Sequence, residues 1–427
     1  MLHRRPLALA LSALALALAC KQEPPPQPPV TTTTAAPEPA AEPEVPCNYL
    51  VIVDAGSSGT RAYAYQITTP EGGGVPTAIA QVSGLKASPG LATFKDDPAG
   101  ASKQIGDLLK QEGGVLAAVP QTCHARTKVA VMATGGMRLL EGQPGGDASA
   151  GRLYDAVLAS IKETGLDAVF AGTISGTQEA VYGWLSANYA LGLVGGDTTV
   201  GTLDLGGASS SIAFVPQDAG DAPTTKVKLG DKVFQVYAHS YLNYGVDQAR
   251  QYLNYDACFP KGVGKGTGKY GDCVKKLESS LKPSKCAAKG CGLADPSDKD
   301  HAGVPQPALP AGVRFHAFSV FEYTRAFFKL PADATPAALA EAAGGKNGKA
   351  GFCATPYKTI AEQNQGVDEK YLQSYCFDAA FIGTLLKLHG FAPTSDAISW
   401  SDKLGEHDAT WTLGAALCSV TGCLASQ

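Results

Sequence analysis

The sequence lacks several features that mark common classes of binding protein. No Gly-x-x-x-x-Gly-Lys-[Ser/Thr] motif occurs, so a Walker-A phosphate loop is absent. No basic stripe with interleaved aromatic residues occurs either, and the formal net charge is −4, so we expect no nucleic-acid partner. The cysteines lack the paired Cys-x-x-Cys spacing and nearby histidine pairs of zinc sites. What is present is a chain of 427 residues, long enough for two sizeable lobes.

Long hydrophobic runs are also missing, except for a short one at the N-terminus. Arg4 and Arg5 precede a Leu/Ala-rich run that ends at Ala19-Cys20, which is the layout of a secretory signal. This run is too short for a comfortable transmembrane helix. Cys20 follows a small residue, as in a bacterial lipobox, so we expect its lipidation, with ordinary signal cleavage as the alternative. Residues 1–20 then predict an exported lipoprotein, periplasmic or at the surface of a bacterial envelope, with a membrane anchor at Cys20.

Residues 21–46 are rich in Pro, Thr, Ala and Glu, and so predict an extended tether. Ten cysteines remain beyond Cys20, an even number that favours disulfides in an exported chain. A zinc site among them is the less favoured alternative. Their grouping suggests the pairs Cys353–Cys376 and Cys418–Cys423, two pairs among Cys258, Cys273, Cys286 and Cys291, and then Cys47–Cys123.

The residues from Tyr49 to Ile67 form the stretch around which the chain is organised. An apolar, largely β-branched run ends at Asp54 and continues through small residues into a second extended run. This pattern predicts a buried strand, a tight loop and another strand. Glycines let backbone N–H groups approach an anion closely, and hydroxyls add donors. The predicted phosphate-binding residues of this loop are Gly56, Ser57, Ser58, Gly59, Thr60 and Arg61.

A second stretch repeats this arrangement later in the chain. Val200 to Asp204 is followed by small residues, and Ile212 to Val215 is again apolar. Two ordinary hairpins would explain each stretch alone. Their repetition with an aspartate at the matching position instead predicts two related lobes facing one phosphate, where Asp54 and Asp204 would hold hydrated Mg²⁺ or Ca²⁺. The predicted phosphate-binding residues of the second loop are Gly206, Gly207 and Ala208.

Between and after these loops, strands alternate with helices, which predicts an α/β protein. Helices are expected at 97–112, 151–164, 331–343 and 368–389, and strands at 128–134, 168–174 and 226–237. Ser175 and Gln178 have the spacing of a capping box, so Glu179 lies in the first turn of a helix. Glu179 then either complements the helix dipole or acts as a general base. Residues 261–310 predict an irregular, cross-linked excursion.

Five motifs follow one another along the chain: Asp54–Arg61, Ala133–Leu140, Ile174–Trp184, Asp204–Ser209 and Trp411–Gly414. In this order they resemble the motifs of the nucleoside triphosphate diphosphohydrolases, the apyrase family. The resemblance extends from about Cys47 to Leu417, nearly the whole mature chain.

The resemblance implies a two-lobed fold of the actin, Hsp70 and hexokinase type (ribonuclease H-like), with a nucleotide cleft between the lobes. Lobe I would comprise residues 47–172 and 396–427, and lobe II residues 173–395 with a Cys-rich excursion at 256–313. By the same resemblance, Glu179 activates the attacking water, Ser209 helps to place it, and Asp54 and Asp204 hold the water shell of Mg²⁺ or Ca²⁺. Thr134 would lie near the metal and the terminal phosphate.

Ser211 departs from the family pattern, because a water-orienting Gln is usual at this position. We include Ser211 among the predicted catalytic residues, with slower turnover or a bound solvent molecule as the consequences. The resemblance implies an apyrase that hydrolyses the terminal phosphate of nucleoside di- and triphosphates, and the N-terminal signal predicts its export. We also expect a monomer. The alternatives are an enzyme of the exopolyphosphatase and guanosine pentaphosphate phosphohydrolase type, and a non-catalytic nucleotide-binding lipoprotein.

Overall fold

The structure is a computed structural model that describes residues 46–286 and 290–424. The predicted signal, the lipidation site and all of the predicted tether except Pro46 lie outside this part. The residues from Cys47 onward form one compact unit. In the described part of the chain, no helix has the length and apolar character needed to cross a membrane.

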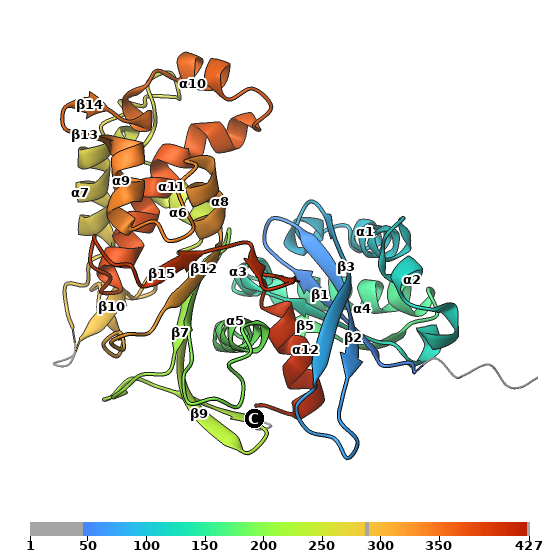
Figure 1. Cartoon of the computed structure of the whole chain (residues 1–427). Coiled ribbons are helices and arrows are strands. Elements are labelled where there is room, and N and C mark those ends of the chain that lie inside the picture. Colours follow the sequence, from blue (N-terminus) through green and yellow to red (C-terminus); the bar gives the residue numbers. More distant parts are fainter. Residues whose placement is uncertain (1–45, 287–289, 425–427) are drawn as a thin grey trace, which may run out of the picture. The chain divides into compact units, whose positions relative to one another are not determined.

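Two mixed sheets organise this unit (Figure 1). The five-stranded sheet has the order β3-β2-β1-β4-β5, and the six-stranded sheet has the order β15-β12-β6-β7-β9-β8. The first sheet contains β1 (Tyr49–Ala55), β2 (Thr60–Thr68), β3 (Ala78–Ala87), β4 (Lys128–Ala133) and β5 (Asp167–Thr173). The second contains β6 (Gly201–Leu205), β7 (Ser209–Phe214), β8 (Thr225–Leu229), β9 (Lys232–Leu242), β12 (Phe315–Ser319) and β15 (Ile398–Trp400).

Helices cover both faces of each sheet, which explains why β1 is apolar along most of its length. Val51 and Val53 pack in a cluster with α1 (Pro98–Lys110) and α4 (Gly146–Lys162). Leu50 and Ile52 face the other way, into a cluster with α5 (Gly176–Ala190) and α12 (Thr412–Thr421). The same cluster includes side chains from β7 and β9, so α5 and α12 lie between the two sheets (Figure 1).

The other face of the six-stranded sheet packs on a helical layer with its own apolar core. The main helices of this layer are α7 (Tyr270–Leu281), α8 (Val320–Phe327), α9 (Pro336–Gly344) and α11 (Glu369–Leu388). Residues 396–427 were assigned to lobe I from the sequence, whereas β15 pairs with β12 in this second sheet. The lobe boundaries themselves stay a prediction.

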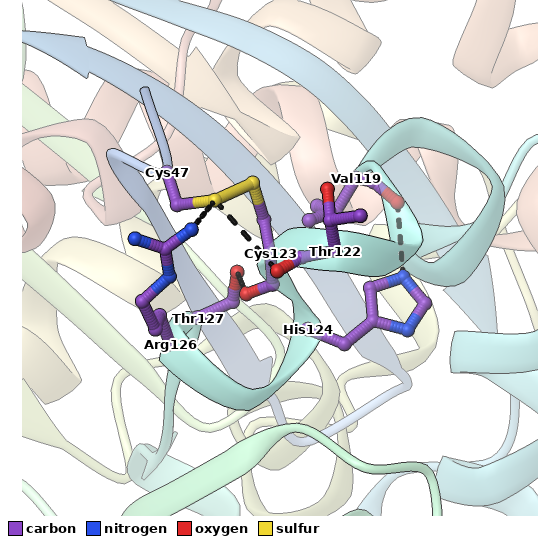
Figure 2. Close-up of a disulfide and its surroundings, with 7 residues drawn as sticks. All are labelled: Cys47, Val119, Thr122, Cys123, His124, Arg126 and Thr127. Carbon is purple, nitrogen blue, oxygen red and sulfur yellow. Dashed lines mark hydrogen bonds between the residues drawn. A yellow bond between two sulfur atoms is a disulfide. The ribbon is translucent and has the colours of Figure 1, made fainter. Parts of the chain in front are cut away.

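Five disulfides join the cysteines beyond Cys20, as the sequence grouping suggested. Cys47–Cys123 connects the segment just before β1 with the short 3-10 helix Gln121–Arg126 that precedes β4 (Figure 2). The Arg126 guanidinium lies 2.8 Å from the Cys47 sulfur, and Thr127 Oγ1 donates to the Cys123 carbonyl at 2.9 Å. The remaining pairs are Cys258–Cys273, Cys286–Cys291, Cys353–Cys376 and Cys418–Cys423.

Two of the expected elements are wrong in detail. The extended segment at 226–237 is a hairpin, because Gly230 adopts a positive φ of 59° and turns β8 back into β9. The irregular excursion at 261–310 contains the twelve-residue helix α7. Cys273, Leu277 and Leu281 follow each other at four-residue spacing and are buried, so this helix has an apolar face that its Lys-rich surroundings obscured.

Candidate active site

The two predicted loops have the same backbone geometry. In the first, Gly56 N–H donates to the Gly59 carbonyl at 3.0 Å; in the second, Gly206 N–H donates to the Ser209 carbonyl at 2.9 Å. Each loop joins two antiparallel strands, and each follows an aspartate by two residues. The repetition read from the sequence is therefore a repetition in structure, with one copy in each sheet.

Both loops line one cavity of about 140 Å³. Asp54 and Asp204 face it from β1 and β6, and Glu179 reaches it from the first turn of α5. Of the predicted site residues, the cavity is lined by Asp54, Gly56, Ser57, Ser58, Arg61, Thr134, Glu179, Asp204, Gly206, Gly207, Ala208 and Ser209. The shared cleft expected from the sequence is thus present.

Close packing explains why glycine is required beside this cavity. A Cβ atom on Gly136, at the start of α3 (Gly135–Glu141), would lie 2.8 Å from Ser57 Cα. A Cβ atom on Gly207 would lie 2.4 Å from Asp247 Oδ2 and 2.7 Å from Ser57 Oγ. Ser57 of the first loop therefore packs against both α3 and the second loop, and a side chain at Gly136 would push α3 away from the Ser57 backbone.

Glu179 is held by a residue to which the sequence analysis assigned no role. Arg138 Nη2 donates to Glu179 Oε2 at 2.8 Å and to Ser209 Oγ at 3.3 Å, and Nη1 donates to the Ile174 carbonyl at 3.0 Å. The side chains of Arg138 and Glu179 are only 14% and 12% exposed. One guanidinium thereby fixes the predicted base, the predicted water-placing serine and the strand end that leads into α5.

The capping box predicted at Ser175 is confirmed. Gln178 N–H donates to Ser175 Oγ at 3.1 Å, and Ser175 N–H donates to Gln178 Oε1 at 2.9 Å. These bonds satisfy backbone donors that the first turn of a helix leaves unpaired. They therefore set where α5 begins and direct Glu179 toward the cavity.

Three predicted site residues do not line the cavity. Gly59 and Thr60 lie at the loop–strand junction behind it, and Thr60 pairs with Ala55 and Ala87 in the sheet. Ser211 lies on β7, where it pairs with Asp204 of the neighbouring strand β6, and it does not line the cavity.

The cavity is also lined by residues that the sequence did not predict to be part of the site. They are Tyr63, Gly135, Leu205, Phe318, Ser319, Val320, Tyr323, Ala409, Thr410 and Trp411.

Burial raises the pKa of both aspartates to about 7. For Asp54 the Arg61 guanidinium, 3.8 Å away, opposes the increase, while Glu179 adds to it. For Asp204 the negative charge of Glu179 is the second cause. Asp204 Oδ1 is buried and has no hydrogen-bond partner within the described residues. Burial disfavours the charged form of both carboxylates, and both face the same cavity, so a cation bound there would stabilise their ionised form.

The donor set fits a hydrated divalent cation such as Mg²⁺ or Ca²⁺. Hard cations prefer carboxylate oxygens, and Mg²⁺ usually keeps several waters while binding one or two carboxylates and substrate phosphates. Across residues 46–286 and 290–424, no group of three or more His, Cys, Asp or Glu side chains is arranged to enclose a metal ion. Asp54 and Asp204 are thus the residues that would hold one, through its water shell.

These pKa values predict an unusual pH dependence of stability. Without divalent cations, the folded protein keeps Asp54 and Asp204 protonated up to about pH 7, whereas unfolded aspartates ionise near 3.8. The folded state binds more protons in this window, so the contribution of the two groups to the free energy of unfolding falls as pH rises through it.

The measurement is the difference in Tm between Asp54→Asn and wild type in EDTA. We expect the Tm of the variant to rise relative to that of wild type between pH 5 and pH 8. We also expect Mg²⁺ to raise the Tm of wild type at pH 8. A constant difference across the pH range would contradict the pKa assignment.

Comparisons with known proteins agree with this geometry. Residues 42–259 and 252–427 match the model of the GDA1/CD39 (nucleoside phosphatase) family. The chain belongs to this family. It is 30% identical to Probable apyrase 3 of Arabidopsis thaliana, with 87% of this chain and 82% of that protein covered. It is 31% identical to ectonucleoside triphosphate diphosphohydrolase 1 of Mus musculus, with 86% and 80% covered. The family resemblance stated from the motifs is therefore confirmed.

The fold prediction is confirmed as well. A crystal structure of nucleoside triphosphate hydrolases from Neospora caninum superposes with a TM-score of 0.62 at 15% identity, covering 88% of this chain and 92% of that one. At this identity the similarity concerns the fold alone.

Proposed function

We propose that this protein hydrolyses the terminal phosphate of nucleoside tri- and diphosphates by attack of a water molecule on phosphorus. The observation that supports this most is the shared cavity in which two repeated loops, Asp54, Asp204 and Glu179 meet. Membership of a nucleoside phosphatase family agrees with it. The roles of the individual residues are part of the proposal.

Glu179 is the general base in this account. Its carboxylate accepts a proton from the attacking water, while Arg138 keeps the carboxylate oriented and Ser209 offers its hydroxyl to the same water. Positioning contributes as much as basicity, because phosphoryl transfer involves little covalent chemistry by the protein.

The loops bind the phosphates in this account. With no Walker-A lysine in the sequence, backbone N–H groups and the hydroxyls of Ser57 and Ser58 are the main donors. Arg61 supplies a positive charge on the cavity wall. A bound Mg²⁺ or Ca²⁺ would neutralise charge on the phosphate oxygens. Asp54 and Asp204 would orient its water ligands.

The proposal is tested by phosphate release from ATP, ADP and long-chain polyphosphate, with Mg²⁺ or Ca²⁺ and with EDTA. We expect turnover of both nucleotides and loss of turnover in EDTA. Preferential turnover of polyphosphate would indicate an exopolyphosphatase. Binding of ADP without phosphate release above that of a Glu179→Gln control would indicate a non-catalytic nucleotide-binding protein.

Arg138 gives a prediction that separates positioning from folding. Arg138→Lys keeps a positive charge but cannot reach Glu179, Ser209 and the Ile174 carbonyl together, because an ammonium lacks the planar fork. We expect kcat to fall roughly tenfold to a hundredfold with a smaller change in KM. The measurement is steady-state kinetics with ADP, together with Tm. Unchanged kcat in a folded variant would contradict the role of Arg138.

We also propose export with a lipid anchor at Cys20. The signal-like residues 1–20 and the five disulfides support it, since disulfides persist in oxidising compartments. Mass spectrometry of the mature N-terminus tests it: a diacylated Cys20 is expected, and cleavage elsewhere without lipid would contradict it.

A further inference from the structure

A row of side chains crosses the six-stranded sheet away from the cavity. Phe318 pairs with Asp204, Asp204 with Ser211, and Ser211 with Ser240. Directly paired residues project from the same face of a sheet. Ala213 and Ala238, two residues from Ser211 and Ser240, belong to the cluster around α5, so the row lies on the α5 side. The first two members line the cavity, and the next two continue beneath α5.

Two oxygens in this row are buried without a hydrogen-bond partner within the described residues: Asp204 Oδ1 and Ser240 Oγ. The proposed cation accounts for Asp204. Nothing described so far accounts for Ser240, and most buried hydroxyls in proteins bind either a protein group or an ordered water. Ser211, between the two, is itself only 8% exposed.

The unpartnered hydroxyl lies close to the group that holds the base. The position that a Cβ atom of Gly176 would occupy is 3.1 Å from Ser240 Oγ and 3.8 Å from Arg138 Cζ. Gly176 is the first residue of α5, three before Glu179. Arg138 uses three hydrogen bonds on Ile174, Glu179 and Ser209. A guanidinium has five N–H donors, so it can also donate to solvent here.

We propose that Ser211 and Ser240 bind an ordered water molecule between their hydroxyls, beneath the first turn of α5, and that Ser240 is a positioning residue for Glu179. The water would give Ser240 Oγ the hydrogen-bond partner that it lacks among the described residues. Ser240 packs against Gly176, the first residue of the helix that carries Glu179, and this contact is the route by which Ser240 would position the base. The positioning role rests on the proposed function, whereas the water site does not.

Ser240→Ala tests the positioning role, and Ser210→Ala is its matched control. Ser210 Oγ is also buried and unpartnered among the described residues, but it points to the opposite face, as does its neighbour Ile212 in the other core. We expect Ser240→Ala to lower kcat for ADP roughly threefold to tenfold with KM within twofold, because an ordered water is lost. Ser210→Ala is expected to match wild type. Equal effects of the two variants, or none, would overturn the positioning role.

Ser211→Gln provides a second arm, because its longer amide side chain occupies the water site. In this background Ser240→Ala should lower kcat no further, and an undiminished effect would count against a shared water. A high-resolution crystal structure should show water density between Ser211 Oγ and Ser240 Oγ in wild type and none in Ser211→Gln. Absence of that density in wild type overturns the water site. Wild-type protein that releases no phosphate would refute the proposed function and the positioning role, while the density still decides the water site.

Discussion

Glu179→Gln is expected to lower kcat for phosphate release from ATP and ADP by about a thousandfold, within the range of a general base. The amide has nearly the same shape but cannot accept the proton of the attacking water. It can still accept one hydrogen bond from Arg138, which donates to Glu179 Oε2 at 2.8 Å in the wild type. The loss should therefore appear in kcat with little change in nucleotide affinity, measured by steady-state kinetics and calorimetric titration of ADP.

Glu163→Gln is the matched control for this experiment. Glu163 is exposed at the end of α4, far along the chain from either loop, and its substitution should leave kcat unchanged. A folded Glu179→Gln variant that retains more than a tenth of wild-type kcat would show that another group takes the proton.

Asp204→Asn is expected to raise the Mg²⁺ concentration for half-maximal activity and to lower kcat at limiting Mg²⁺ by about a hundredfold, because metal-ion catalysis supplies several kcal/mol. Asp204 carries the buried, unpartnered Oδ1 that faces the proposed cation. Mg²⁺ should also raise the Tm of wild type but not of the variant, since an ion that binds only the folded state stabilises it.

The control for this variant is Asp155→Asn, which removes an exposed carboxylate on α4 and should leave the Mg²⁺ dependence unchanged. An Asp204→Asn variant with the wild-type Mg²⁺ midpoint and the wild-type shift in Tm would contradict a cation held at this position.

Local patterns carried the parts of the fold and site that were predictable. A β-branched run that ends in Asp and small residues predicts a strand followed by a tight loop. This pattern depends only on residues close together in the sequence, so both loops could be predicted. The capping box at Ser175 likewise depends on residues within one turn of helix. The repetition of Asp54 and Asp204 then implied a shared cavity, which the structure contains.

Contacts between distant segments could not be predicted in this way. The role of Arg138 depends on Glu179 and Ser209, which are 41 and 71 residues away in the sequence. The sequence around Arg138, Gly135-Gly136-Met137-Arg138, contains no local sign of these partners. The burial that raises the pKa of Asp54 and Asp204 also depends on the tertiary structure rather than on neighbouring residues in the sequence. Helix α7 was not predicted, because its apolar face has only three buried residues and the surrounding sequence is rich in lysine and glycine, which is typical of an irregular segment.

The most direct test of the account is a crystal structure of wild-type protein with a non-hydrolysable ADP analogue and Mg²⁺. We predict the terminal phosphate between Gly56–Gly59 and Gly206–Ser209, the cation on the side of Asp54 and Asp204, and a water between Glu179 and phosphorus. An analogue bound elsewhere, or bound with Glu179 turned away from its terminal phosphate, would contradict the proposed reaction.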